Sequence, residues 1–258
     1  MALLETKDLS IHFGGLWAVK DVDFTIDPKE VVGLIGPNGS GKTTFLNIIS
    51  GIYPASKGTV HFRGENITGL KPYEIFKKGM SRTYQASRLC WDLSVVDNIL
   101  IGLSTKQKAG FLDVILRPKK TNDEIYQGVQ ECMDMISYFN PKLIDRRYEL
   151  TKNIPHIDRR RIEISRALVG HPALLLLDEP TAGLNDEETM SMMEDIRKIK
   201  EKIQDICIII IEHDMKVMES VPQRIVVFNA GMKIAEGLYN EVVKDPDVIH
   251  AYLGGAAV

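Results

Sequence analysis

Eight residues near the N-terminus have the types and spacing of a phosphate-binding loop. The pattern G-x-x-x-x-G-K-[ST] is met by Gly36, Pro37, Asn38, Gly39, Ser40, Gly41, Lys42 and Thr43, and Thr44 extends the set. Glycines allow the backbone to bring its N–H groups close to a polyphosphate. Lys42 adds positive charge for the β- and γ-phosphates, and the Thr43 hydroxyl suits Mg²⁺, which takes few protein ligands. The loop therefore predicts a site for a polyphosphate with Mg²⁺.

Two carboxylates follow an apolar run in the second half of the chain. Asp178 and Glu179 come directly after Leu174 to Leu177, and ligands of open α/β sheets bind at the carboxyl ends of the strands. Asp178 can hold Mg²⁺, and Glu179 can orient or deprotonate a water that attacks the γ-phosphate. The alternative is a solvated acidic turn, and the phosphate-binding loop upstream favours the functional interpretation.

Two further polar side chains follow apolar segments. His213 comes just after Ile208 to Glu212, so it could reach the same phosphate edge and sense hydrolysis. Gln85 follows Met80 to Tyr84 and is a neutral side chain that can reach Mg²⁺ or the attacking water. The predicted catalytic residues are therefore Lys42, Gln85, Glu179 and His213, and the predicted metal ligands are Thr43, Gln85 and Asp178.

Three nearly continuous apolar runs must position these residues. Segments 31–35, 173–177 and 206–211 have the composition of strands that are buried on both faces. Such strands predict a central parallel sheet covered by helices. The segment Phe45 to Ser50 predicts a helix directly after the phosphate-binding loop. Alternating Val22, Phe24 and Ile26, together with Thr59 to Phe62, predict antiparallel strands in the first part of the chain.

The middle of the chain has a different pattern of apolar and polar residues. Residues 98–167 show helical periodicity broken by polar stretches, which predicts a helical subdomain inserted into the connections of the sheet. Within it, the basic segment Arg117 to Lys120 contains a proline and is predicted to be a loop. Further helices are expected over Asp186 to Gln204 and Asp247 to Leu253.

Composition narrows the class of protein. With 258 residues, 44% of them hydrophobic, the chain can bury one large core or a core with a subdomain. The net charge of -3 offers no basic surface for nucleic acid. Its three cysteines lie far apart, which indicates structural thiols in a reducing compartment. No apolar run is long enough to cross a bilayer and the N-terminus lacks a signal-peptide layout, so we expect a cytoplasmic chain.

In their order, these segments resemble the nucleotide-binding subunit of ABC transporters. The resemblance rests on the phosphate-binding loop, Arg82 to Gln85, Asp178 to Asn185 and Glu212 to Asp214. Within that superfamily, the chain is most similar to the branched-chain amino-acid importer ATPases. The segments that favour this branch are Phe13-Gly14-Gly15, Arg161 to Ala167, Ile211 to Met215, Asp245 to Ile249 and Ala251 to Gly254. The similarity covers nearly the whole chain.

This resemblance implies a single ABC ATPase domain over residues 1–258, with an α/β P-loop NTPase core, an antiparallel β subdomain and an inserted helical subdomain. It implies an ATPase that powers import through permease subunits at the inner face of the membrane, with a second ATP-binding subunit and, indirectly, a substrate-binding protein. Phe13 would stack on adenine, unless it is an ordinary core aromatic. Gln85 would sense the membrane subunit, and Ala182 to Asn185 would cross to the second ATP-binding subunit. One alternative is an ATPase subunit for a different cargo, such as an amide, urea or lipopolysaccharide. The other is a soluble ABC protein without a transport role.

One segment departs from the family pattern. Ile154 to Asp158 aligns with the signature that normally reads Leu-Ser-Gly-Gly-Gln and that contacts the γ-phosphate on the opposite subunit. Ile157 replaces a glycine and Asp158 replaces a neutral amide. A β-branched side chain crowds the approach, and a carboxylate near phosphate repels it. We therefore expect a heterodimer with unequal sites and low ATPase activity for this chain alone. The alternative is neutral drift, with Arg159 to Arg161 as a solvated face or as compensating charges.

The stretch after Gln85 carries three large apolar side chains. Leu89, Trp91 and Leu93 alternate with polar residues, a pattern that fits a small core or an exposed apolar surface. We favour an exposed docking surface for the permease, because large exposed apolar groups usually mark contacts.

Overall fold

The three apolar runs form the middle of a six-stranded sheet. The structure, a computed structural model, describes residues 1–106 and 118–253. In it, β3 (Val31–Ile35), β7 (Leu174–Asp178) and β8 (Cys207–Ile211) are buried along their whole lengths. The strand order is β10-β9-β3-β8-β7-β6, and only β9 and β10 pair in the antiparallel sense. The predicted parallel sheet is thus confirmed, with bounds that agree to within one residue.

Three shorter or less apolar strands complete this sheet and were not predicted from the sequence. They are β6 (Met80–Arg82), β9 (Arg224–Asn229) and β10 (Met232–Gly237). A second sheet is antiparallel, as predicted, with the order β2-β1-β4-β5. Its strands are β1 (Leu4–Phe13), β2 (Leu16–Ile26), β4 (Lys57–Phe62) and β5 (Glu65–Asn66).

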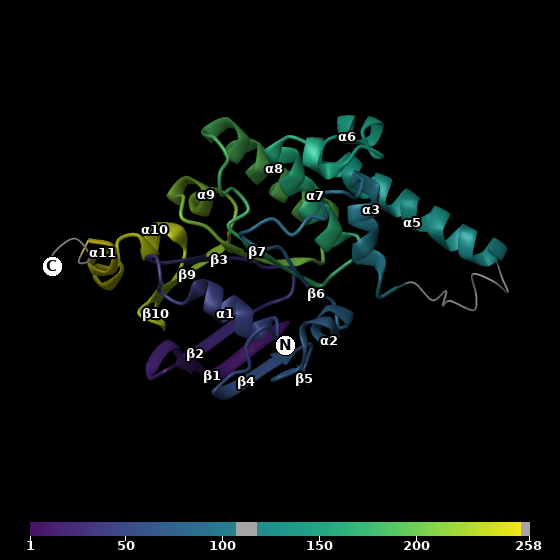
Figure 1. The fold of residues 1–258 in the computed structure, drawn as a ribbon. Coiled ribbons are helices and arrows are strands. Elements are labelled where there is room, and N and C mark those ends of the chain that lie inside the picture. Colours follow the sequence, from purple (N-terminus) through teal and green to yellow (C-terminus); the bar gives the residue numbers. More distant parts are fainter. Residues whose placement is uncertain (107–117, 254–258) are drawn as a thin grey trace.

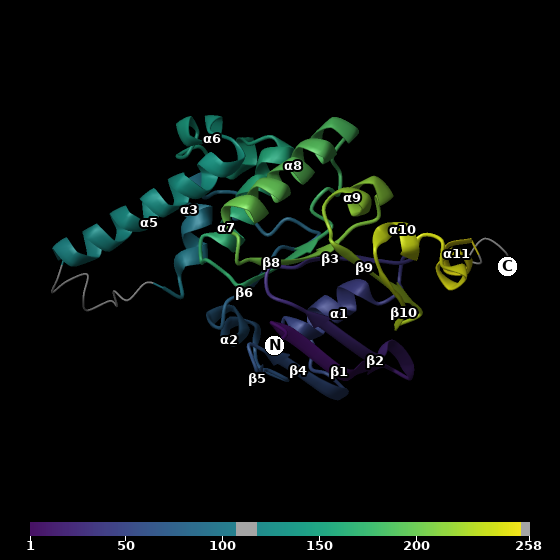
Figure 2. The ribbon, with the colours of Figure 1, turned by 180° about the vertical axis from the view of Figure 1, so that it is seen from behind.

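Helix α1 (Lys42–Ile49) lies between the two sheets (Figure 1). Its Phe45 ring contacts Phe24 of β2 at 5.3 Å and Phe228 of β9 at 5.4 Å between ring centroids. One buried aromatic therefore ties the helix that follows the phosphate-binding loop to both sheets. The other face of the large sheet is covered by α8 (Asp186–Lys202), α9 (Met215–Ser220) and part of α7 (His156–Leu168) (Figure 2).

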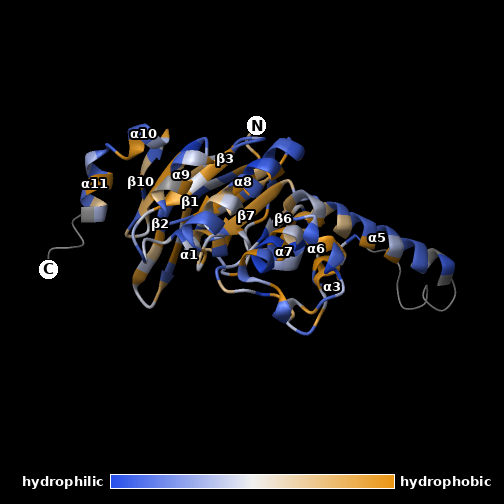
Figure 3. Cartoon of the chain, turned by 90° about the horizontal axis from the view of Figure 1, so that it is seen from above, coloured by the Kyte–Doolittle hydropathy of each residue, from blue (hydrophilic) through white to orange (hydrophobic). Residues whose placement is uncertain are grey.

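The remaining helices of the core are short. They are α2 (Pro72–Lys77), α10 (Tyr239–Val242) and α11 (Pro246–Leu253). Helices α8 and α11 match the predicted helices to within two residues at each end. From above, the central strands are largely hydrophobic, whereas α7 and α8 carry many hydrophilic residues (Figure 3). Within the described part of the chain, no helix combines the length and the apolar character that a membrane span requires.

A group of helices lies between β6 and β7. It contains α3 (Val95–Leu100), the 3-10 helix η1 (Ile101–Leu103), α5 (Pro118–Phe139), α6 (Lys142–Asp145), the 3-10 helix η2 (Thr151–Asn153) and α7 (His156–Leu168). These helices share a separate hydrophobic cluster whose members run from Leu89 to Val169. They form the predicted inserted helical subdomain, and its exact bounds of 98–167 stay a prediction.

The predicted loop at Arg117 to Lys120 is wrong for the residues that can be checked. Pro118 to Lys120 form the first turn of α5, and Arg117 lies outside the described residues. Proline is tolerated in the first turn of a helix because the N–H group that it lacks has no intrahelical partner there. A Pro flanked by basic residues therefore marked the start of a helix.

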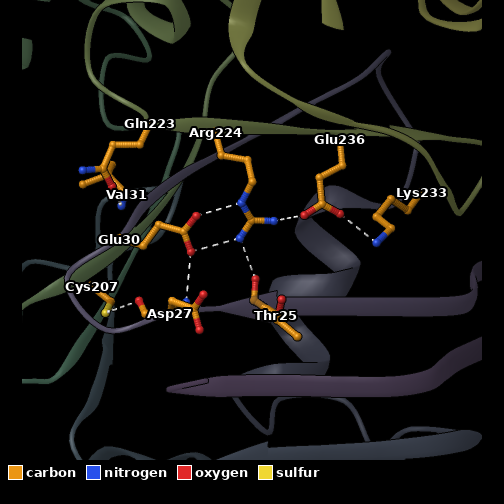
Figure 4. Close-up of polar contacts among 9 residues, drawn as sticks. All are labelled: Thr25, Asp27, Glu30, Val31, Cys207, Gln223, Arg224, Lys233 and Glu236. Carbon is orange, nitrogen blue, oxygen red and sulfur yellow. Dashed lines mark hydrogen bonds and ion pairs between the residues drawn. The ribbon is translucent and has the colours of Figure 1, made fainter. Parts of the chain in front are cut away.

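A charged network joins the two sheets at the edge opposite the phosphate-binding loop (Figure 4). Arg224, at the start of β9, contacts Glu30 Oε1 through Nε at 2.7 Å, the carbonyl oxygen of Thr25 at 2.8 Å, and Glu236 on β10. Burial opposes the ionisation of Glu30, but the hydrogen bonds and charge of Arg224 leave the pKa of Glu30 below its ordinary value. The network thus links β2 of the small sheet to β9 and β10 of the large one.

Candidate active site

The backbone of the phosphate-binding loop requires glycine at several positions. Gly36, Gly39 and Gly41 have φ angles of 145°, 77° and 104°. A Cβ atom on Gly36 would lie 2.0 Å from the carbonyl oxygen of Phe228, and one on Gly41 would lie 2.5 Å from that of Ala18. The spacing of glycines in the sequence therefore has a steric cause, since no other residue combines these angles with this close packing.

The Lys42 ammonium lies within the loop. Its Nζ atom donates to two backbone carbonyls of the loop at 2.7 and 3.0 Å and to Ser40 Oγ at 3.3 Å. Burial lowers the pKa of Lys42, while the charges of Glu179 and Asp178 act in the opposite direction. The loop thus places a largely buried cation at the N-terminus of α1, an arrangement that favours bound anions.

The two oxygen ligands predicted for Mg²⁺ face each other. Thr43 Oγ1 lies 3.4 Å from Asp178 Oδ1, although these residues are far apart in the sequence. A hydroxyl and a carboxylate are the hard ligands that Mg²⁺ prefers, and this ion usually takes the rest of its shell from water and phosphate. Within the described ranges, no group of three or more His, Cys, Asp or Glu side chains gathers as a metal site. The hydroxyl and carboxylate oxygens of Thr43 and Asp178 fit Mg²⁺.

Glu179, Gln85 and His213 meet at the edge of the large sheet. Glu179 Oε1 is 2.5 Å from His213 Nε2, and its Oε2 accepts a hydrogen bond of 2.6 Å from Gln85 Nε2. Glu179 has a φ angle of 49°, and its backbone N–H donates to the Ile211 carbonyl at 2.9 Å. A non-glycine residue held at positive φ often marks a functional site. In this structure Gln85 contacts the proposed base rather than the proposed metal ligands.

A pocket of about 640 Å³ unites most of the predicted residues. Its lining, as far as the structure describes it, consists of Ala18, Asn38 to Thr44, Gln85, Glu179 and His213. Phe13 is outside this set. Its side chain is 49% exposed and makes an edge contact with Tyr53 at 5.4 Å between ring centroids. Phe13 is therefore not a core aromatic, and its contact with adenine stays a prediction.

The segment aligned with the family signature differs from the sequence-based expectation at one point. Asp158 is buried, with 8% of its surface exposed. Its Oδ1 atom forms an ion pair with Arg161 Nη1 at 2.9 Å and accepts a hydrogen bond from Asn140 Nδ2 at 3.1 Å. The carboxylate is thus neutralised inside its own subunit, and the expected repulsion of phosphate by Asp158 is wrong as stated. Ile157 lies in the first turn of α7 and is partly exposed, and its steric effect on the opposite subunit stays a prediction.

The three arginines that follow are not a solvated face. Arg161 also pairs with Asp195 Oδ2 at 2.8 Å. Arg160 is buried and donates to the carbonyl oxygens of Gln85 at 2.9 Å and Ala182 at 3.4 Å. Arg159 stacks on Trp91, with 5.1 Å from its guanidinium carbon to the ring centroid. Arg160 and Arg161 therefore position neighbouring segments.

Two positioning residues were missed by sequence reasoning. Arg82 forms a buried ion pair with Asp178. Glu212 accepts hydrogen bonds from the backbone and hydroxyl groups of Thr181, at 2.8 and 2.5 Å, and so holds the turn that follows Glu179. Burial raises the pKa of Glu212, against these hydrogen bonds, which lower it. Both residues lie inside segments that carry the family resemblance, Arg82 to Gln85 and Glu212 to Asp214, but sequence reasoning gave neither of them a role.

Comparison with known proteins decides the family. The family model described as ABC transporter matches residues 19–182. The chain belongs to the ABC transporter family. A second model, described as branched-chain amino acid ATP-binding cassette transporter, matches residues 232–258 of this cassette. Family membership makes the cassette an ATP-binding, ATP-hydrolysing transporter subunit.

Individual relatives agree with this assignment over almost the full length. The cassette is 36% identical to the high-affinity branched-chain amino acid transport ATP-binding protein LivG of Escherichia coli, with 98% of each chain covered. It is 35% identical to BraF of Pseudomonas aeruginosa, again with 98% of each covered. A solved nucleotide-free ATP-binding cassette of an ABC transporter superposes with a TM-score of 0.84, at 27% identity, over 98% of this chain and 100% of that one.

Proposed function

We propose that this cassette hydrolyses ATP to power the import of branched-chain or related amino acids through a membrane permease. The convergence of Lys42, Thr43, Asp178, Glu179 and His213 on one edge of the sheet carries the ATPase part of this proposal. The names of its relatives support the cargo. The cassette would sit in the cytoplasm against the inner face of the membrane, and a separate substrate-binding protein would select the amino acid.

Each residue has a distinct proposed role. Backbone N–H groups of the loop and Lys42 bind the phosphates, and Thr43 with Asp178 holds the metal ion. Mg²⁺, when bound, neutralises charge on the phosphate oxygens. Glu179 accepts the proton of the attacking water, His213 orients the Glu179 carboxylate, and Gln85 controls access to its second oxygen. Gln85 could also reach the metal ion if it left Glu179.

Lys42→Ala is expected to weaken ATP binding, because the variant lacks the cation that faces the phosphates. Equilibrium binding of a fluorescent ATP analogue to the purified cassette measures this. Glu179→Gln serves as the control for folding and for the specificity of the effect, since it should retain wild-type affinity. Equal affinity in wild type and Lys42→Ala would remove the phosphate-binding assignment.

The permease partner has a candidate surface next to the site. A groove of about 350 Å³ runs between the core and the helical subdomain, and its lining includes Tyr73, Phe76, Tyr84, Ile101 and Arg166. Of these, Tyr73 is 56% and Ile101 is 42% exposed. Large exposed apolar groups around a groove fit a contact with another protein, and we propose that a permease helix docks here.

The predicted docking residues divide between core and surface. Leu89 is 5% exposed and belongs to the hydrophobic cluster of the helical subdomain. Trp91 and Leu93 are 42% and 39% exposed. The docking hypothesis is therefore kept for Trp91 and Leu93 and is wrong for Leu89, whose side chain the subdomain itself covers.

Trp91→Ala is expected to uncouple ATP hydrolysis from transport in the assembled transporter while the isolated cassette stays folded. The measurements are cargo uptake by reconstituted vesicles and the melting temperature of the cassette alone. Leu89→Ala is the matched comparison, because truncating a buried leucine typically costs about 2–5 kcal/mol of stability. If Trp91→Ala unfolds the isolated cassette as Leu89→Ala should, Trp91 belongs to the core.

The cargo is decided by the partners. Purification of the cassette from native membranes, followed by identification of the proteins that accompany it, tests for a permease and a substrate-binding protein. Binding measurements on that substrate-binding protein with leucine, amides and urea then assign the cargo. Recovery of the cassette without any membrane protein would favour the alternative of a non-transport ABC protein.

A further inference from the structure

A buried arginine contacts the carboxylate that is proposed to bind Mg²⁺. Arg82 ends β6, three residues before Gln85, and its Nη2 atom lies 2.7 Å from Asp178 Oδ2. The two side chains are 5% and 2% exposed. An ion pair this far from water is not a casual surface contact, because each charge would be costly to bury without the other.

The same guanidinium is fixed by a second element. Its Nη1 atom donates to Asn47 Oδ1 at 2.8 Å and to Ser50 Oγ at 3.0 Å, at the C-terminal end of α1. The guanidinium carbon also lies 5.1 Å from the centroid of the Tyr84 ring. Arg82 therefore has a defined position relative to the helix that begins with the phosphate-binding residues.

We propose that Arg82 is a positioning residue that determines which oxygen of Asp178 faces the metal ion. Arg82 occupies Oδ2, which leaves Oδ1 directed at Thr43 Oγ1, 3.4 Å away. The planar fork of arginine holds a carboxylate in a fixed orientation, whereas a lysine ammonium acts as a point charge. Arg82 thus presents one preoriented oxygen to Mg²⁺, between the hydroxyl of α1 and the end of β7.

Two physical effects of Arg82 on metal binding have opposite signs. A fixed cation near the site repels Mg²⁺, so its removal would strengthen metal binding. A hydrogen bond that orients a ligand strengthens metal binding, and loss of such an outer partner typically costs about 10–100-fold in metal affinity. We expect orientation to dominate, because the phosphates of ATP bring negative charge that offsets the single positive charge of Arg82.

This inference rests on the proposed ATP·Mg²⁺ site and adds a link to the groove. Arg82 and Tyr84 both line the groove between the core and the helical subdomain. The residue that orients the metal ligand is therefore also part of the surface proposed to bind the permease. A shift of β6 caused by an occupant of the groove would be transmitted directly to Asp178.

The test is the ratio of nucleotide affinities with and without Mg²⁺. A fluorescent ATP analogue is titrated into the purified full chain in Mg²⁺ and in EDTA, for wild type, Arg82→Gln and Arg82→Lys. We expect both variants to keep wild-type affinity in EDTA. The enhancement by Mg²⁺ should fall at least about tenfold in Arg82→Gln, and less in Arg82→Lys, which retains the charge but not the planar fork.

Arg88→Gln is the matched control, because Arg88 lies over the same Tyr84 ring at 5.4 Å but is exposed and pairs with no metal ligand in the described structure. It should leave the Mg²⁺ enhancement unchanged.

An unchanged or larger enhancement in Arg82→Gln would overturn the inference, as would loss of folding in both Arg82 variants, since the ion pair would then be purely structural. If wild type itself shows no Mg²⁺ enhancement, the proposed metal site fails instead. If Arg82→Gln alone fails to fold, a Mg²⁺ enhancement in Arg82→Lys equal to that of wild type overturns the inference, and a reduced one supports it.

Discussion

Glu179→Gln is expected to lower the rate of ATP hydrolysis by about 10²–10⁴-fold, the usual contribution of a positioned general base. Affinity for ATP should stay at the wild-type value. The glutamine oxygen can still accept from Gln85, and its amide can donate to His213 when that ring carries its proton on Nδ1, so the contacts of 2.6 and 2.5 Å can both persist. Only the capacity to accept a proton from water is removed.

Steady-state phosphate release and equilibrium binding of a fluorescent ATP analogue measure the two effects separately. His213→Asn is an informative companion, because it perturbs the orientation of Glu179 without removing the base and should cause a smaller loss. A Glu179→Gln variant that no longer binds ATP would count against the assignment of Glu179 as the base, since the residue would then belong to the binding surface.

The double variant Ile157→Gly, Asp158→Gln is expected to raise the ATPase rate of the purified cassette by more than roughly tenfold, because loss of one transition-state donor typically costs about a hundredfold or more. The expectation rests on the family arrangement in which the signature of one subunit meets the ATP of the other. Ile157, partly exposed in the first turn of α7, stands where that arrangement needs a close backbone approach.

The structure sharpens this test by separating the two substitutions. Since Asp158 is already paired with Arg161 and Asn140, Ile157→Gly alone should produce most of the increase. Asp158→Gln alone should mainly lower the melting temperature, because Arg161 would keep only Asp195 as an ionic partner. Unchanged rates in both Ile157→Gly variants, with dimerisation verified, would show that the altered signature is neutral.

An increase would support a heterodimer with unequal sites. In such a dimer this cassette supplies an intact phosphate-binding loop and base to one site and the altered signature to the other. The partner would retain glycine and glutamine at the matching positions. Size-exclusion chromatography of the cassette with candidate partner subunits, followed by ATPase assays on the mixture, tests this directly.

The central fold was predictable because its strands are apolar throughout. Segments 31–35 and 206–211 contain almost no residue that could face water, so burial on both faces was the only consistent solution. Strand β6 has three residues, and strand β10 is partly exposed along most of its length. Neither has enough periodicity to be recognised from sequence, and only pairing with a neighbouring strand defines it.

The sequence predicted which residues belong to the candidate site, but not which of them contact one another. Position after a buried strand predicted that Glu179 and His213 lie near the loop, where both line the pocket, and that Asp178 does too, whose Oδ1 atom is 3.4 Å from Thr43 Oγ1. The pairing of Arg82 with Asp178 joins residues 96 positions apart, and that of Asn140 with Asp158 depends on how α5 ends against α7. Contacts of this kind arise from tertiary packing, for which a single sequence carries no local signal.

The contacts of Glu179 with Gln85 and His213 bear on how fast the cassette hydrolyses ATP between transport cycles. With Gln85 on one carboxylate oxygen and His213 on the other, two of the acceptor positions that an attacking water could use are already occupied. Gln85 is exposed, and its segment begins at the groove where the permease is proposed to dock. We therefore expect ATP hydrolysis without transport to stay slow until the permease moves Gln85 away from Glu179. The rate of hydrolysis would then follow the arrival of cargo rather than the concentration of ATP.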